Sequence, residues 1–500
     1  MNQIIVHKNL VYIFNPLVSG NMSLQTGLIW AIVIILGLLT LSAVFMLIPQ
    51  AYKRLDKLVL LFIALAPFHT IIRSISVDSV LLSGWRDILF AGIVALWLLG
   101  IIKGRFPLRA NPLVLTVFLL NIMGVVLILR ADLLLVGLAG YRDIIKYSLL
   151  AVVTYSLCHE QPLFLRRIVV TIFIVGVVVV ALQFVFYFLG LDYVLRLGTM
   201  APPYRNIGPF YLRRMEAFFG GGPSALGLYL GMPLVIYLEL QQLGQKVHKW
   251  WHLGALLLLL GVIMTFSFSA VLVVGLVYSV LLFRRGGNIV YKLAVLAVLL
   301  VVFLGLNAGF SGAVIGDQVA TNFSSYLINI FGKALFFGNL SILLNDPTTF
   351  IVGRGFALVG AKFFLNTTNQ AGVMIIGNSD GGWVELAIQV GAPLVLLLLL
   401  AIVRTFLRAF SQSRKLPTSL RVTTWALLAA LVVMFSSIHQ IPWIRVGPDV
   451  NFWIVIGALA SVPIIAHRHG TGQILGGSTR LAGQATQATE AISVRQSMDS

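Results

Sequence analysis

The chain has 500 residues, of which 59% are hydrophobic and only 10% charged, and its mean hydropathy is +0.98. This composition excludes a soluble globular protein and is typical of a polytopic membrane protein, in which each span takes about 20 apolar residues. The net charge of +19 does not indicate a nucleic-acid partner, because basic residues in so apolar a chain set orientation and meet anionic membrane lipid. The single cysteine, Cys158, excludes an intrachain disulfide and a metal-thiolate site.

The apolar runs predict an all-α polytopic membrane protein with about thirteen transmembrane helices (12–14). Residues 1–27 form an N-terminal leader that we expect to lie in the membrane interface, and 28–306 hold helices 1–10. The expected spans are 28–48, 57–72, 85–102, 112–129, 143–158, 168–189, 223–240, 252–267, 269–283, 288–306, 383–402, 421–437 and 452–465.

Between the tenth and eleventh spans, residues 307–382 form one large polar loop, and helices 11–13 then occupy 383–465. The tail 466–500 is rich in Gly, Ala, Gln, Ser and Thr, which predicts disorder. The strongly basic short loops recur every second span, so the positive-inside rule places them and the tail in the cytoplasm. The large loop then faces outward, while the side of the N-terminus depends on the exact number of spans.

The positive-inside rule disfavours arginines in outer loops, so their presence there requires an explanation other than membrane orientation. The 190–222 loop carries three of them, followed by glycines and the start of a helix: Arg205, Arg213, Arg214, Gly220, Gly221, Gly222 and Pro223. Guanidinium groups bind phosphate bidentately, and a helix N-terminus favours anions. The competing interpretation is that these arginines contact lipid phosphates or pair with Glu216 and Asp192. The functional interpretation is favoured for Arg214.

Two carboxylates lie beside the eleventh span, and each has a structural and a functional interpretation. Asp380 can cap the helix that begins near Trp383, or it can accept a proton from a sugar hydroxyl as a general base. Glu385 lies at the start of the span, where an ionised carboxylate requires a partner or a role. Arg354 stands in a Gly-Arg-Gly turn of the large loop, and Arg142 lies in the predicted 130–143 outer loop.

Other polar residues give weaker signals. Asp143 and Lys146 are one turn apart and are interpreted as a structural ion pair. His439 is interpreted as a solvated interfacial histidine. No spacing of His, Cys and carboxylates indicates a metal site, and no glycine motif indicates a nucleotide cofactor.

Four segments resemble motifs of the bacterial O-antigen ligase and O-antigen polymerase family. They are Arg214-Met215-Glu216-Ala217-Phe218-Phe219 through Gly222-Pro223, Thr265-Phe266-Ser267, Val352-Gly353-Arg354-Gly355, and Asp380 through Gly391 continuing into Ala392-Pro393-Leu394. The resemblance covers roughly residues 140–465. Two departures matter: the ligases have a His-Asn pair at Asp380-Gly381, and the arginine that follows the family's Thr-x-Ser is Phe268 here.

The resemblance implies a C-type glycosyltransferase-like fold in the bacterial inner membrane, with the active site on the periplasmic face. The donor would be a glycan on undecaprenyl pyrophosphate, with no metal or other cofactor. Arg214, Asp380 and Glu385 would be catalytic. The substrate-binding residues would be Arg205, Arg213, Glu216, Arg354 and Arg142.

The missing histidine favours polymerisation of lipid-linked O-antigen or exopolysaccharide repeat units, with a chain-length regulator as a candidate partner. The alternative is an O-antigen ligase that transfers the glycan to lipid A-core, in lipopolysaccharide synthesis, or to another acceptor. A second alternative is a secondary transporter or a flippase for lipid-linked oligosaccharides. The sugar, the linkage, the anomeric outcome and the oligomeric state stay open.

Overall fold

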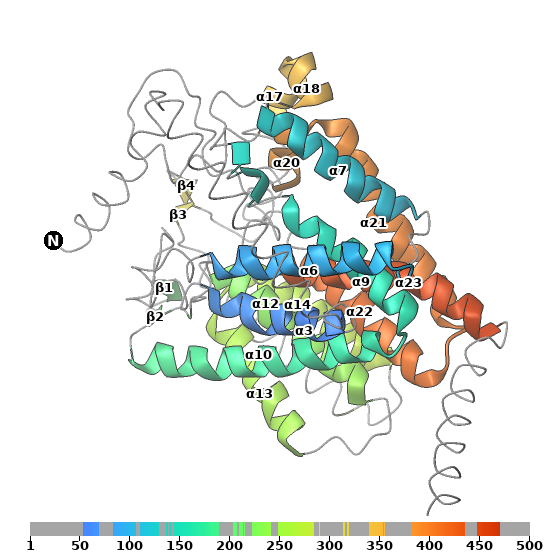
Figure 1. Cartoon of the computed structure of the whole chain (residues 1–500). Helices are drawn as coiled ribbons and strands as arrows, with labels where there is room; N and C mark the ends of the chain where they lie inside the picture. The colour runs from blue at the N-terminus through green and yellow to red at the C-terminus, as the bar shows by residue number, and fades with distance from the viewer. Residues whose placement is uncertain are drawn as a thin grey trace, which may run out of the picture.

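A computed structural model shows a helical membrane protein (Figure 1). It describes residues 54–69, 84–106, 111–129, 137–138, 140–142, 145–189, 204–207, 210–213, 215, 223–241, 249–284, 290, 314–315, 318–319, 340–353, 355, 382–435 and 448–470. Within these residues, six helices are long and apolar enough to cross a membrane, and three shorter helices are also apolar.

The six long helices are α6 (Trp85–Ile102), α7 (Pro112–Leu129), α10 (Phe164–Leu189), α21 (Ala392–Ser413), α22 (Thr418–Phe435) and α23 (Pro448–Gly470). The shorter elements are α3 (Leu55–Leu65), η2 (Ala66–Phe68), η3 (Lys146–Ser148), α9 (Leu149–Glu160), α12 (Pro223–Leu240), α13 (Lys249–Met264), α14 (Phe268–Arg284), α17 (Leu340–Asn345), α18 (Pro347–Val352) and α20 (Gly382–Val390). Two antiparallel ribbons complete the described part: β1 (Tyr204–Ile207) with β2 (Phe210–Arg213), and β3 (Val314–Ile315) with β4 (Gln318–Val319).

The predicted helical character is confirmed, whereas the count of thirteen spans stays a prediction. The expected span 28–48 lies outside the described residues, and 288–306 does so except for Val290. The expected span 383–402 is not one helix, because α20 ends at Val390 and α21 starts at Ala392. Gly391 between them has a φ of 92°, a left-handed conformation that interrupts a right-handed helix.

Ion pairs show that α6 and α9 run in the same direction. Near their starts, the Lys146 ammonium contacts the Asp87 carboxylate. At the other end, Arg105, just after α6, places its Nε 2.7 Å from Oε1 of Glu160, the last residue of α9. We call these two ends of the helix bundle the Asp87 end and the Glu160 end.

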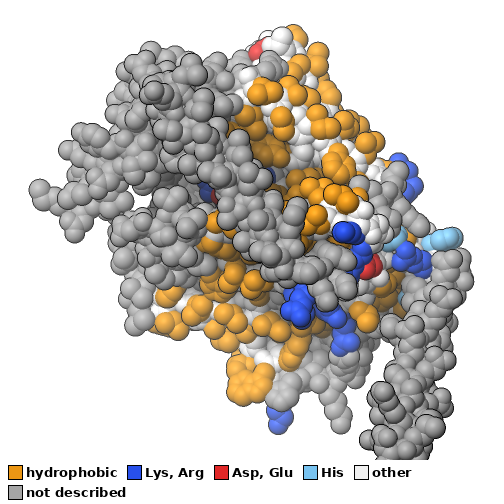
Figure 2. Space-filling view, in the orientation of Figure 1, with side chains coloured by type: hydrophobic (Ala, Val, Ile, Leu, Met, Phe, Trp, Pro, Cys, Tyr) orange, Lys and Arg blue, Asp and Glu red, His pale blue; other side chains and the backbone are white. Residues whose placement is uncertain are grey.

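Contacts with α6 and α9 show at which of these two ends α23 and α3 begin or finish. Arg468, in the last turn of α23, donates a hydrogen bond of 2.6 Å to the carbonyl oxygen of His159, so α23 finishes at the Glu160 end. The C-terminal part of α3 lies at the Asp87 end, because the rings of Phe62 and Trp85 are 6.4 Å apart. Lys and Arg side chains gather on the right of Figure 2, where α23 finishes in Figure 1.

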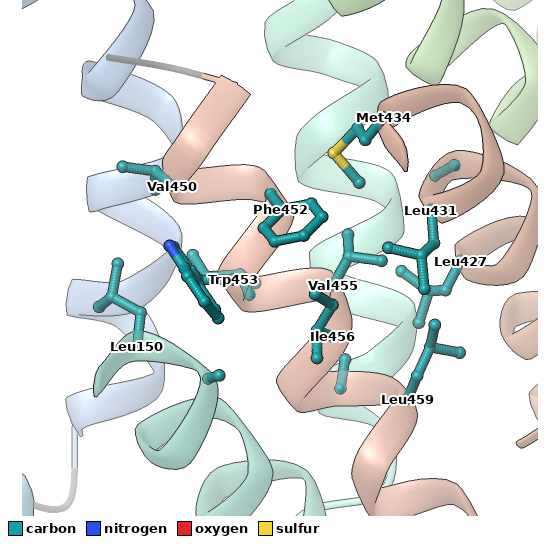
Figure 3. Packing of buried hydrophobic residues seen from close by; sticks show 14 of the residues in the cluster. Leu150, Leu427, Leu431, Met434, Val450, Phe452, Trp453, Val455, Ile456 and Leu459 are labelled. Atoms are coloured by element: carbon teal, nitrogen blue, oxygen red, sulfur yellow. The ribbon is translucent and has the colours of Figure 1, made fainter. Parts of the chain in front are cut away.

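The core of the bundle is formed where α9, α22 and α23 pack together. Figure 3 shows Leu150 of α9 beside Trp453 of α23, and Leu431 of α22 facing the other side of α23. All ten residues from Leu150 to His159 are buried, so α9 is surrounded by protein. A helix that lipid does not surround has no need to match the thickness of the bilayer, which accounts for its length of only 12 residues.

Candidate functional site

A cluster of charged side chains lies at the Asp87 end of α6 and α9. The Asp87 carboxylate is shared, because Oδ1 accepts a hydrogen bond from the Lys146 ammonium while Oδ2 lies 2.9 Å from Arg142 Nε. Arg86 follows Trp85 at the start of α6 and is 4% exposed. Three cations and one carboxylate thus meet where two helices begin.

Tyr147 is the aromatic centre of this cluster. The Arg86 Cζ atom lies 5.2 Å from the centroid of its ring, and the Lys146 Nζ atom lies 4.7 Å from it. Such distances allow cation–π attraction, which is strongest where water is excluded. The charges of Arg86, Asp449, Asp87 and Arg142 all influence the Tyr147 hydroxyl, so a second carboxylate, from the first turn of α23, contributes to the electrostatics of the cluster.

The ring of Tyr147 is held by apolar neighbours on two helices. The Phe90 ring of α6 packs edge-on at 5.4 Å, and the Phe62 ring of α3 lies 5.9 Å away. The residue is 1% exposed, yet its hydroxyl has no hydrogen-bond partner in the described part of the chain. A buried hydroxyl without a partner costs about 1–3 kcal/mol, so its retention here requires an explanation.

A polar network supports the cluster from α7. The Tyr141 hydroxyl donates a hydrogen bond of 2.9 Å to Asn121 Oδ1, and Asn121 Nδ2 donates one of 2.9 Å to Ser148 Oγ. Burial raises the pKa of Tyr141, so its hydroxyl stays protonated and able to donate at neutral pH. These bonds connect η3, which carries Lys146, to the neighbouring helix and fix its position.

A second feature of the Asp87 end joins two of the segments that carry the family resemblance. The backbone N–H of Met215 donates a hydrogen bond of 2.9 Å to the carbonyl oxygen of Met264, the last residue of α13. The Thr265-Phe266-Ser267 turn follows directly, and Phe266 has a φ of 44°. This left-handed conformation is rare for a bulky residue and separates α13 from α14.

This junction belongs to the Asp87 end because of a contact between α12 and α23. The side chain of Tyr229, in the second turn of α12, lies close to that of Asn451, in the first turn of α23. Thr265 also packs near the start of α12, where a Cβ atom added to Gly227 would lie 3.0 Å from Thr265 Oγ1. The Thr-x-Ser turn is therefore placed beside the helix that Pro223 opens.

A third feature joins the other two resembling segments. The backbone N–H of Gly355 donates a hydrogen bond of 3.1 Å to the carbonyl oxygen of Gln389, at the end of α20. Gly353, with a φ of 80°, lies so close to Gln389 and Gly391 that no side chain would fit. The Gly-x-Gly turn is thus locked against the break between α20 and α21, near Leu127 in the last turn of α7.

Some of the predicted site residues lie in the described part of the chain and others do not. Arg142 lies in the charged cluster with Asp87. Arg205 and Arg213 belong to the β1–β2 ribbon, where Arg205 pairs with Leu212 and Arg213 with Tyr204, and Glu385 belongs to the first turn of α20. The remaining predicted residues lie outside the described part of the chain: Arg214, Glu216, Arg354 and Asp380.

Sequence reasoning missed the functional potential of Arg86, Asp87, Lys146 and Tyr147. Asp143, the expected partner of Lys146, is outside the described residues, and the observed partner Asp87 is 59 positions away. The available signal was the Trp85-Arg86-Asp87 start of an expected span, because ionisable groups at membrane depth need partners or a function. Among the described residues, no group of three or more His, Cys, Asp or Glu could hold a metal ion.

No protein-family model matches the chain, and no curated protein matches it either. The resemblance to O-antigen ligases and polymerases therefore depends on the four sequence segments. In the structure, the described parts of these segments meet in two pairs, Met215 with Met264 and Gly355 with Gln389.

Proposed function

We propose that the chain is a bacterial inner-membrane glycosyltransferase that polymerises undecaprenyl-pyrophosphate-linked oligosaccharide repeat units. In this proposal the Glu160 end faces the cytoplasm, because basic residues accumulate there, and the Asp87 end faces the periplasm. The observation that carries the proposal is the hydrogen bond from Met215 to Met264. It joins the arginine-containing segment to the Thr-x-Ser turn, two of the four segments that carry the family resemblance.

The proposed reaction is a displacement at the anomeric carbon of the donor sugar. An acceptor hydroxyl attacks that carbon, the bond from carbon to pyrophosphate oxygen breaks, and the electron pair leaves with the lipid pyrophosphate. The hydroxyl proton passes to a carboxylate, for which Asp380 is the first candidate and Glu385 the second. Arg214, with Arg205, Arg213 and Arg354, stabilises the negative charge of the departing pyrophosphate.

The Gly-x-Gly junction supports the same proposal from a second direction. Gly353 and Gly355 are held by backbone contacts to α20, the helix that contains Glu385. A backbone fixed at both ends of Arg354 suits a residue that must hold a charged group in one place. In the same way, the turn after α13 is fixed at a strained Phe266.

The decisive experiment is polymerisation by the purified full chain in proteoliposomes supplied with lipid-linked repeat units. Wild-type protein should produce a ladder of polymers on a gel. Arg214→Ala and Asp380→Asn should each reduce the yield by at least about 100-fold, the usual loss when a charge-stabilising or proton-accepting group is removed. Arg408→Ala is the control, because this arginine is exposed near the end of α21.

The outcomes separate this proposal from the alternatives. Long polymers made by Arg214→Ala at normal protein levels would contradict the pyrophosphate role. Transfer of one glycan to lipid A-core, without growth of the polymer, would identify a ligase. Movement of the lipid-linked oligosaccharide across the bilayer without a new glycosidic bond would identify a flippase or transporter.

A further inference from the structure

We propose that the charged cluster around Tyr147 is a binding site for a phosphate oxyanion, in which Arg142, Lys146 and Tyr147 contact the ligand. Assignment of that oxyanion to the diphosphate of a lipid-linked donor rests on the proposed function. The existence of the oxyanion site does not, because it follows from the described side chains alone.

The balance of charge is the first argument. Arg86, Arg142 and Lys146 supply three positive charges, while Asp87 and Asp449 are the carboxylates whose charges act in the same described cluster. Positive charge in excess at a partly dehydrated site favours an anionic ligand. Arginine and lysine together also provide the forked and the single-point contacts that proteins use to hold phosphate.

The route into the cluster is the second argument. The side chains of Arg142 and Asp87 are 47% and 35% exposed, whereas the Lys146 side chain is only 8% exposed. The cluster is therefore open on the side of Arg142 and closed behind Lys146. An oxyanion can enter beside Arg142 and compete with Asp87 for both cations, without unfolding either helix.

The Tyr147 hydroxyl is the third argument and is independent of the charges. It is buried on a ring that Arg86 and Lys146 contact at 5.2 and 4.7 Å, with no hydrogen-bond partner in the described part of the chain. In a purely structural ion-pair cluster, phenylalanine would be more stable at this position, because it fills the same space without the free-energy cost of burying an unpaired hydroxyl. A ligand oxygen that accepts a hydrogen bond from this hydroxyl accounts for its presence.

The test uses full-length protein in phosphatidylcholine nanodiscs, with inorganic pyrophosphate as the probe. Thermal unfolding is followed with increasing pyrophosphate, which should raise the midpoint of the wild type through preferential binding to the folded state. Tyr147→Phe should unfold near the wild-type midpoint without ligand but should weaken the apparent Kd by about tenfold, as expected for one lost charge-assisted hydrogen bond. Arg142→Gln should weaken it at least as much.

Tyr155→Phe is the matched control, because Tyr155 is an equally buried tyrosine of α9 that lies beside His159 towards the Glu160 end. Its response to pyrophosphate should equal that of the wild type. The site is overturned if Tyr147→Phe and Arg142→Gln both respond like the wild type. It is also overturned if Tyr155→Phe loses the response as fully as they do.

Further arms of the test distinguish the source of the phosphate. If nanodiscs of phosphatidylglycerol abolish the response to pyrophosphate, the cluster binds a lipid headgroup, and the assignment to the donor is wrong. If the response persists there and undecaprenyl pyrophosphate competes for it, the donor assignment is supported. Tyr147-dependent binding by a chain that makes no polymer would contradict the proposed function and leave the oxyanion site standing.

Discussion

Gly231 of α12 lies directly against the Val274 side chain of α14. A Cβ atom added to Gly231 would lie 3.3 Å from both Val274 Cβ and Val274 Cγ1, and nearer still to Cγ2. Helices inside membrane proteins approach closely through such small residues, and packing at the contact then contributes to stability. The next two predictions depend on what each glycine faces.

Gly231→Ala should lower the free energy of unfolding by about 1–3 kcal/mol, because an extra methyl overpacks a tight contact. Val274→Ala in the same chain should recover part of this loss, since the obstacle is a side chain. A double-mutant cycle in denaturant measures the coupling between the two changes. Losses that simply add would show that the two positions are not in contact.

Gly457→Ala should be destabilising without a comparable rescue. This glycine of α23 faces the backbone of α9, where the added Cβ atom would lie 2.7 Å from Ala151 Cα. Ala151→Gly leaves that backbone in place, so the double variant should remain at least about 1 kcal/mol less stable than wild type. Full recovery in the unfolding midpoint would contradict the close approach of α9 and α23.

Gly353→Ala should destabilise the protein more than Gly104→Ala does. Both glycines have a positive φ, of 80° and 68°, so both variants carry backbone strain of at least about 1 kcal/mol, and the ψ of 165° at Gly353 adds to it. Only Gly353 is crowded, because its added Cβ atom would lie 2.6 Å from the carbonyl carbon of Gln389, whereas nothing lies within 4 Å at Gly104. Equal losses of unfolding free energy would argue against the packing of the Gly-x-Gly turn on α20.

Arg167→Gln should destabilise the Glu160 end. Arg167 lies 2.7 Å from Asp56, whose side chain is only 8% exposed, so the variant leaves a buried carboxylate without this partner. We expect a loss of about 1–2 kcal/mol, less than for a fully buried pair because the Arg167 side chain is 54% exposed. Asp56→Asn combined with Arg167→Gln should recover stability, and unfolding in detergent compares the three chains.

Continuous apolar runs predicted several helices well. The expected spans 85–102 and 112–129 coincide with α6 and α7, because continuous apolar runs bounded by polar residues define both ends. The expected span 383–402 was interrupted, since the conformation of Gly391 depends on its contact with the Gly353 turn. Sequence shows that a glycine is present, but not that another segment requires it to leave the helix.

The candidate site was less accessible to sequence reasoning. The family resemblance implied a substrate-binding role for Arg142, which stays a prediction; the structure shows Arg142 beside Asp87 in the charged cluster. Its neighbours come from α6, η3 and α23, and a contact such as that of Asp87 with Lys146 leaves no local pattern. The pairing of Met215 with Met264 is similarly long-range, although both segments were recognised separately by their motifs.

The enclosure of α9 constrains the order in which the protein can be assembled. Its contact with α23 joins His159 to Arg468, which are 309 positions apart, so the ribosome makes the partner long after α9 has emerged. Until α23 packs against it, α9 exposes to lipid part of a surface that is buried in the folded protein, including the polar side chains of Ser156 and His159. The partly assembled bundle must therefore stay open until α23 inserts, and a chain that stops before residue 448 should be degraded by membrane proteases rather than accumulate as a stable protein.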